Sequence, residues 1–66
     1  MNISRKRIEQ EAELKVMTIR DVAIKAGIHP QSLYRVLSRG RCTPRILRLI
    51  AGALEIDPAK LLQANN

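Results

Sequence analysis

The amino-acid sequence predicts an all-α protein, folded as one compact domain of five short helices. Apolar residues recur at spacings of three and four along most of the chain, as they do on one face of a helix. Capping residues, prolines and glycines punctuate these stretches where helices begin and end. Because 66 residues can bury only a modest aliphatic core, we expect a single domain over residues 1–66.

The first helix is predicted to start after Ser4, whose hydroxyl is a suitable cap, and to run to about Lys15. Ile8 and Ala12 lie one turn apart and would form its inward face. The sequence leaves the end of this helix open, because three apolar residues fit either the helix or the following connection: Leu14, Val16 and Met17.

The second helix is predicted between Thr18 and Gly27. Thr18 and Asp21 have the spacing of a capping box, with Asp in place of the preferred Glu. Gly27 suits the position after the helix, where a positive φ is common and a side chain costs energy. One face of this helix is apolar: Ile19, Val22, Ala23 and Ala26.

The third helix is predicted to begin at Pro30, which needs no N–H partner in a first turn, and to end at Gly40. Its inward residues follow the i, i+3, i+4 pattern: Leu33, Val36 and Leu37. The opposite side is polar or amphipathic: Gln31, Tyr34, Arg35 and Ser38.

Thr43 and Pro44 repeat this start for a fourth helix that is apolar over nearly half its circumference. The apolar residues are Ile46, Leu47, Leu49, Ile50, Ala53 and Leu54. Asp57 and Pro58 start a fifth, short helix, in which Leu61 and Leu62 would close the bottom of the core. Residues 63–66 are expected to be frayed.

Charge is distributed unevenly along the chain, whose net charge is +6. No acidic residue occurs between Asp21 and Glu55, while this stretch contains six cations: Lys25, Arg35, Arg39, Arg41, Arg45 and Arg48. A field of one sign favours a polyanionic partner, and nucleic acid is the leading class. The alternative is a solvated surface that keeps the protein soluble.

The spacing around Gly27 predicts two helices that meet at a steep angle. Ala23 supplies the small residue needed where the helices are closest, and Gly27 makes the turn four residues later. Ile28, Leu33 and Val36 then wedge the next helix against the first. This is the spacing of a helix-turn-helix, although a plain helical hairpin also fits.

Further residues extend this pattern. The stretch GIHPQSLYRVLSRG at 27–40, then Thr43-Pro44, and the closing ALEIDPAKLL at 53–62 together resemble the phage-repressor and Cro-like helix-turn-helix family. The resemblance covers about residues 14–62. Three positions depart from the family's pattern, where Gln, Glu and Gly are common: Ile19, Ser38 and Glu55.

The resemblance implies a lambda-repressor-like domain whose third helix enters the major groove of DNA. The implied base-reading residues are Pro30, Gln31, Tyr34 and Arg35. The guanidinium of Arg35 can donate twice to guanine, and the amide of Gln31 can pair with adenine. Tyr34 has an alternative role as an amphipathic cover for the edge of the core.

Residues at the helix starts and in the loop after the third helix are implied to hold phosphates: Thr18, Arg20, Arg39, Arg41, Thr43 and Arg45. Exposed backbone N–H groups from Thr43 to Ile46 would add to this anion site. Arg5, Lys6 and Arg7 could form an arm that reaches DNA, or could pair with the glutamates that follow them.

No pattern in the sequence favours catalysis, so we do not expect an enzyme, a metal or a cofactor. His29 has no ligand partners at metal-binding spacing and fits a cap or a DNA edge better. Cys42, the only cysteine, excludes an internal disulfide and fits a reducing cytoplasm. Its cationic loop would make the thiol somewhat acidic, which leaves oxidation sensing as a minor alternative.

We therefore predict sequence-specific binding of double-stranded DNA, as in a transcriptional repressor. One short reading helix binds weakly alone, so a homodimer on a palindromic site is expected, formed either in solution or only on DNA. Interrupted apolar stretches and the absence of a signal-peptide core predict a cytoplasmic protein without a membrane span. The resemblance implies a nucleoid-associated protein of prokaryotic or phage type, and the sequence indicates no small-molecule substrate. The alternatives are an antitoxin-like protein-interaction module and a basic amphipathic peptide at a membrane surface.

Overall fold

Helices account for the regular structure of residues 1–63, the part of the chain that this computed structural model describes. The elements are α1 (Arg5–Leu14), α2 (Ile19–Ala26), α3 (Pro30–Arg39), α4 (Pro44–Leu54) and the 3-10 helix η1 (Pro58–Leu61). No β-strand occurs within these residues, so the all-α prediction is confirmed. The fifth predicted helix is a single 3-10 turn of four residues, too short for α-helical hydrogen bonding to develop.

Side chains cap the start of each α-helix. The hydroxyl of Ser4 accepts a hydrogen bond from the backbone N–H of Arg7 at 3.1 Å. Thr18 and Asp21 form the predicted capping box, in which each side chain accepts from the other residue's backbone N–H, at 3.1 and 2.9 Å. His29 caps α3 through Nδ1, and Thr43 caps α4. All four predicted helix starts are confirmed.

Among residues 1–63, four positions adopt a positive φ. Gly27 and Gly40 end α2 and α3 at φ 77° and 72°, as predicted from their place after each helix. Glu55 ends α4 at φ 59°, and Val16 lies between α1 and α2 at φ 54°. A left-handed conformation costs an L-residue roughly 1–2 kcal/mol, and a β-branched side chain is among the least suited to it.

Replacing Val16 by asparagine is expected to raise the free energy of unfolding by about 1 kcal/mol, because asparagine tolerates positive φ. Val16 is 92% exposed, so its side chain contributes little packing that could be lost. Urea unfolding measures the change. Leu14→Asn is the control, since Leu14 is also exposed but has no positive φ and should gain nothing. Equal effects of the two substitutions would show that Val16 is not strained.

The capping box makes stability depend on pH. The backbone N–H and hydroxyl of Thr18 hold the pKa of Asp21 below its ordinary value of 3.8. A depressed pKa in the folded state contributes stability above the ordinary value, and this contribution is lost as the pH falls through the folded value. The melting temperature of Asp21→Asn should therefore fall less than that of the wild type as the pH is lowered below about 4. Glu13→Gln, which removes a carboxylate with no described partner, should follow the wild-type curve.

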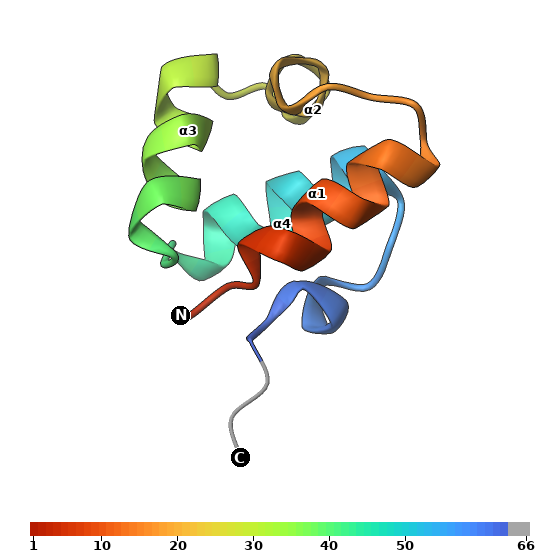
Figure 1. The fold of residues 1–66 in the computed structure, drawn as a ribbon. Helices are drawn as coiled ribbons and strands as arrows, with labels where there is room; N and C mark the ends of the chain where they lie inside the picture. The colour runs from red at the N-terminus through yellow and green to blue at the C-terminus, as the bar shows by residue number, and fades with distance from the viewer. Residues whose placement is uncertain (64–66) are drawn as a thin grey trace.

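The core lies where α2 and α4 pack together. α2 also packs on α3 and α1, and η1 packs on α4 and α1. Figure 1 shows α3 along one edge of the molecule, with η1 below α1 and α4. The fully or almost fully buried residues are Ile3, Ile8, Ala12, Val22, Ala23, Leu33, Leu37, Leu47, Ile50, Ala51, Ala53, Leu54 and Leu61. Six of the residues predicted to face inward are only half-buried: Ile19, Ala26, Val36, Ile46, Leu49 and Leu62.

The chain ends lie against each other, an arrangement that the sequence did not predict. Asn2 and Arg41 form an isolated antiparallel bridge, and Ile3 and Leu62 form another. Gln63 donates its backbone N–H to the carbonyl of Asn2 at 3.2 Å. Gln63 is therefore not frayed, contrary to the prediction, because its backbone has a partner. The rest of the predicted frayed tail, residues 64–66, lies outside the described residues.

Candidate nucleic-acid interface

The polar face of α3 points away from the core. Leu33 and Leu37 are buried beneath it and Val36 is half-buried, which fixes the rotation of the helix. Gln31 and Arg35, one turn apart, are exposed on the opposite side. The structure therefore places side chains with two kinds of planar donor group, an amide and a guanidinium, on one open helical surface.

The other two predicted base-reading residues flank this surface. Tyr34 is 52% exposed, so its ring is available to an external partner and covers little of the core. Pro30 is the first residue of α3 and is half-buried. The N–H of Gln31 is bonded to His29 Nδ1 at 3.1 Å, so the cap holds the first turn of the helix where these side chains begin.

At the start of α2, Thr18 and Arg20 are both exposed. The Thr18 oxygen accepts the cap hydrogen bond, which leaves its hydroxyl proton free to donate to an external group. The backbone N–H groups of Ile19 and Arg20, the first two of the helix, have no partner among residues 1–63. Such N–H groups, together with the helix dipole, favour an anion.

The connection between α3 and α4 carries the remaining predicted phosphate-binding residues, all exposed: Arg39, Arg41, Thr43 and Arg45. Arg39 ends α3, Thr43 caps α4, and Arg41 lies between them beside Asn2. The predicted row of free N–H groups from Thr43 to Ile46 is reduced in the structure. Pro44 has no N–H, and the N–H of Ile46 is bonded to the Thr43 hydroxyl at 3.3 Å.

Acidic side chains neutralise some cations and leave others free. On α1, Arg5 pairs with Glu9 and Arg7 with Glu11, with N–O distances of 3.3 and 3.4 Å, as their spacing predicted. The carboxylate oxygens of Glu55 lie 3.5 Å from the Nζ atom of Lys15 and 4.0 Å from that of Lys25. Arg5, Lys6 and Arg7 are thus part of α1 and do not form an extended arm.

Within residues 1–63, eight cations form no ion pair: Lys6, Arg20, Arg35, Arg39, Arg41, Arg45, Arg48 and Lys60. Five of them are the cations predicted to read bases or to bind phosphates: Arg20, Arg35, Arg39, Arg41 and Arg45. They occur at the start of α2, on α3 and around the start of α4. Their charge is therefore not neutralised by described carboxylates and is available to an anionic partner.

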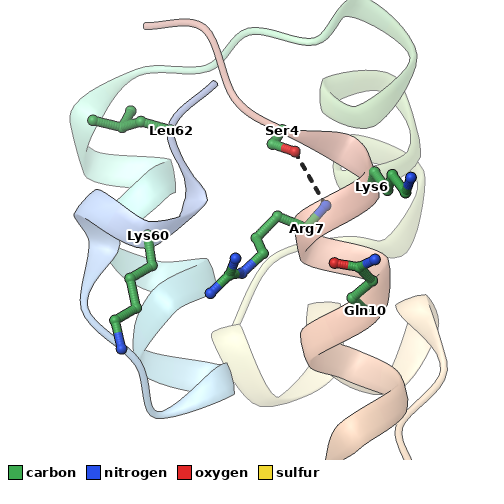
Figure 2. A pocket seen from close by; sticks show the side chains of 6 residues that line it. All are labelled: Ser4, Lys6, Arg7, Gln10, Lys60 and Leu62. Atoms are coloured by element: carbon green, nitrogen blue, oxygen red, sulfur yellow. Dashed lines mark hydrogen bonds between the residues drawn. The ribbon is translucent and has the colours of Figure 1, made fainter. Parts of the chain in front are cut away.

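A surface hollow of about 370 Å³ lies elsewhere, between α1 and η1. Its lining residues are Ser4, Lys6, Arg7, Gln10, Lys60 and Leu62, and Figure 2 shows the Arg7 side chain extending from α1 toward the segment that carries Lys60. None of the predicted base-reading or phosphate-binding residues lines this hollow, although Lys6 and Arg7 of the alternative N-terminal arm do. Its lining contains no acid, histidine or cysteine, and the hydroxyl of Ser4 caps α1 by accepting a hydrogen bond from the N–H of Arg7.

Cys42 is half-buried, and burial raises the pKa of its thiol, although the nearby N-terminal ammonium opposes this. The expectation of a somewhat acidic thiol is therefore wrong, because desolvation outweighs the surrounding positive charge. No three His, Cys, Asp or Glu side chains of residues 1–63 are grouped closely enough to hold a metal ion. In the same range, no helix has the length and apolar character needed to cross a bilayer.

No protein-family model matches the chain, and no curated protein matches it either. Among solved structures, the fold is similar to part of native PhpD with cadmium atoms, with a TM-score of 0.82 and 23% sequence identity. The likeness covers 100% of this chain and 14% of the PhpD chain. At this identity only the fold is shared, and the same arrangement of helices thus occurs as a small part of a longer protein.

Proposed function

We propose that this chain is a sequence-specific, double-stranded DNA-binding regulator of transcription. In this proposal α2 and α3 form a helix-turn-helix within a lambda-repressor-like domain of the phage-repressor and Cro-like family, and α3 lies in the major groove. The ten residues of α3 form a rod about 15 Å long, and the groove is about 12 Å wide, which admits one helix.

The observation that carries the proposal is the separation of paired from unpaired cations. Arg5, Arg7, Lys15 and Lys25 have carboxylate partners, whereas Arg20, Arg35, Arg39, Arg41 and Arg45 have none among the described residues. Lys6, Arg48 and Lys60 are unpaired as well, but these five arginines are the ones on α3, at the start of α2 and around the start of α4, which are the elements that would face a duplex held against α3. Phosphates of a duplex would neutralise them and release counterions, which is the main source of affinity for DNA.

Reading and anchoring are assigned to different side chains. Gln31 and Arg35 contact base edges from the exposed face of α3, with Tyr34 on a phosphate or a thymine methyl. Arg20, Thr18 and the free N–H groups of α2 hold phosphates on one side of the groove. Arg39, Arg41, Thr43 and Arg45 hold phosphates on the other. Base contacts then select the sequence, while phosphate contacts set the register.

Repression would follow from occlusion, because a bound domain blocks access to the duplex. The protein would act in the cytoplasm on the nucleoid, as a homodimer on a palindromic operator. Two copies would place their α3 helices about 34–36 Å apart, one turn of DNA. The free dimer need not be stable, since each copy is also held by its own half-site.

Selection of duplexes from a random pool, followed by fluorescence anisotropy, tests this proposal. We expect an enriched palindromic sequence and a plot of log K against log salt with a slope near −4 to −5, for about five neutralised phosphates. Binding without an enriched sequence would reduce the function to nonspecific DNA binding. No DNA binding, with a protein partner retained after nuclease treatment, would favour the antitoxin-like alternative.

A further inference from the structure

The N-terminal segment (residues 1–4) lies between two other parts of the chain. On one side, the N–H of Ile3 donates to the carbonyl of Gly40 at 2.9 Å, and the N–H of Cys42 donates to the carbonyl of Met1 at 3.0 Å. On the other side, the N–H of Ser4 donates to the carbonyl of Leu61 at 2.8 Å. The segment therefore lies between the α3–α4 connection and the end of η1 and is hydrogen-bonded to both.

We propose that the N-terminal segment is a positioning element for DNA binding. It holds the α3–α4 connection in the conformation that presents Arg39 and Arg41 to phosphates, although the segment itself precedes the helix-turn-helix by many residues. This inference rests on the proposed function. It adds Ile3, which touches no DNA in the proposal, to the residues on which affinity depends.

Besides these hydrogen bonds, the half-buried side chain of Cys42 packs the connection against the core. The N–H of Gly40 bonds back to Val36 and ends α3. Beyond that point, among the described residues, the hydrogen bonds of the Cys42 backbone go to Met1, and Arg41 faces Asn2. Without the segment, Arg41 would be ordered only on binding, and the entropy lost at that step would lower the affinity.

The segment can serve as a fixed support because it is anchored in the core. Ile3 is 3% exposed and belongs to the same buried cluster as Leu37 and Leu61. Ser4 continues directly into α1 as its cap. The connection is therefore attached through three hydrogen bonds of the main chain to an element whose own position is set by apolar packing.

The test compares Ile3→Pro with Ile3→Ala. Both remove packing from the core, but only proline removes the N–H that donates to Gly40. With binding expressed per folded molecule, Ile3→Pro should bind all duplexes about tenfold more weakly than Ile3→Ala. The slope of log K against log salt should be less steep by about 1 for Ile3→Pro, while the preferred sequence stays the same. Equal affinity and equal salt dependence of the two variants would overturn the inference.

Gln63→Pro is the matched control, because it removes a backbone hydrogen bond from the other side of the segment, to Asn2. It should leave DNA affinity unchanged. Should Ile3→Pro not fold, ¹⁵N relaxation of the wild-type protein decides instead. An order parameter near 0.85 for the backbone N–H of Arg41 supports the inference, and one below about 0.6 overturns it. If wild type binds no duplex, the proposed function fails, while the relaxation result still reports on the connection.

Discussion

Replacement of Arg35 by alanine is expected to weaken binding to the selected duplex by about 10- to 100-fold, which corresponds to loss of one bidentate contact to guanine, about 1–3 kcal/mol. Arg35 is exposed on α3, opposite Leu33 and Leu37, and forms no ion pair with described residues. Its loss should relax the preference at one base position. Anisotropy with duplexes that vary at each position measures both effects.

Two further variants separate reading from anchoring. Arg35→Lys keeps the positive charge but loses the planar fork, so it should also relax preference at that position while leaving the salt dependence nearly unchanged. Arg41→Ala should weaken all duplexes about equally and make the salt slope smaller by about 1. If Arg41→Ala changed the preferred base and Arg35→Ala did not, the two roles would have been assigned to the wrong residues.

The sequence predicted the helices accurately where a side chain terminates or caps the element. Thr18, Gly27, Pro30, Gly40 and Pro44 mark positions at which the local chemistry allows few conformations, and the structure has each boundary there or one residue away. The end of α1 was harder to predict because it has no such residue. α1 ends at Leu14, and Lys15 to Met17 form the connection.

Contacts between distant parts of the chain could not be predicted in the same way. The pairing of Ile3 with Gly40 and of Gln63 with Asn2 uses backbone atoms, which every residue has, and therefore leaves no mark in the sequence. The exposed state of Arg35 and Gln31 was predictable, because it follows from helical periodicity. Which lysines have a carboxylate partner was not predictable, because Glu55 reaches Lys25 only through the packing of α4 on α2.

Because the support of α3 depends on a small core, Leu33→Ala should be the most destabilising of these substitutions. Leu33 is completely buried on the inner side of α3, beneath Gln31 and Arg35. Truncation of a buried leucine costs about 2–5 kcal/mol, since it loses apolar burial and leaves a cavity. Domains of this size have a total stability of about 3–5 kcal/mol, so this variant should lose at least about two fifths of its stability, and a larger fraction of its molecules should be unfolded at 25 °C. Circular dichroism and urea titration measure the loss.

Leu14→Ala is the matched control, because it makes the same substitution at a leucine that is 75% exposed. It should change the free energy of unfolding by less than about 0.5 kcal/mol. The comparison links stability to function. An osmolyte such as trimethylamine oxide should restore the folding of Leu33→Ala. If packing from behind serves only to keep α3 folded, the DNA affinity of the refolded variant should then equal that of the wild type in the same osmolyte. A variant that regains its fold but still binds the selected duplex weakly would mean that Leu33 also sets the orientation of α3. The base-reading face would then depend on the shape of the core as well as on its stability.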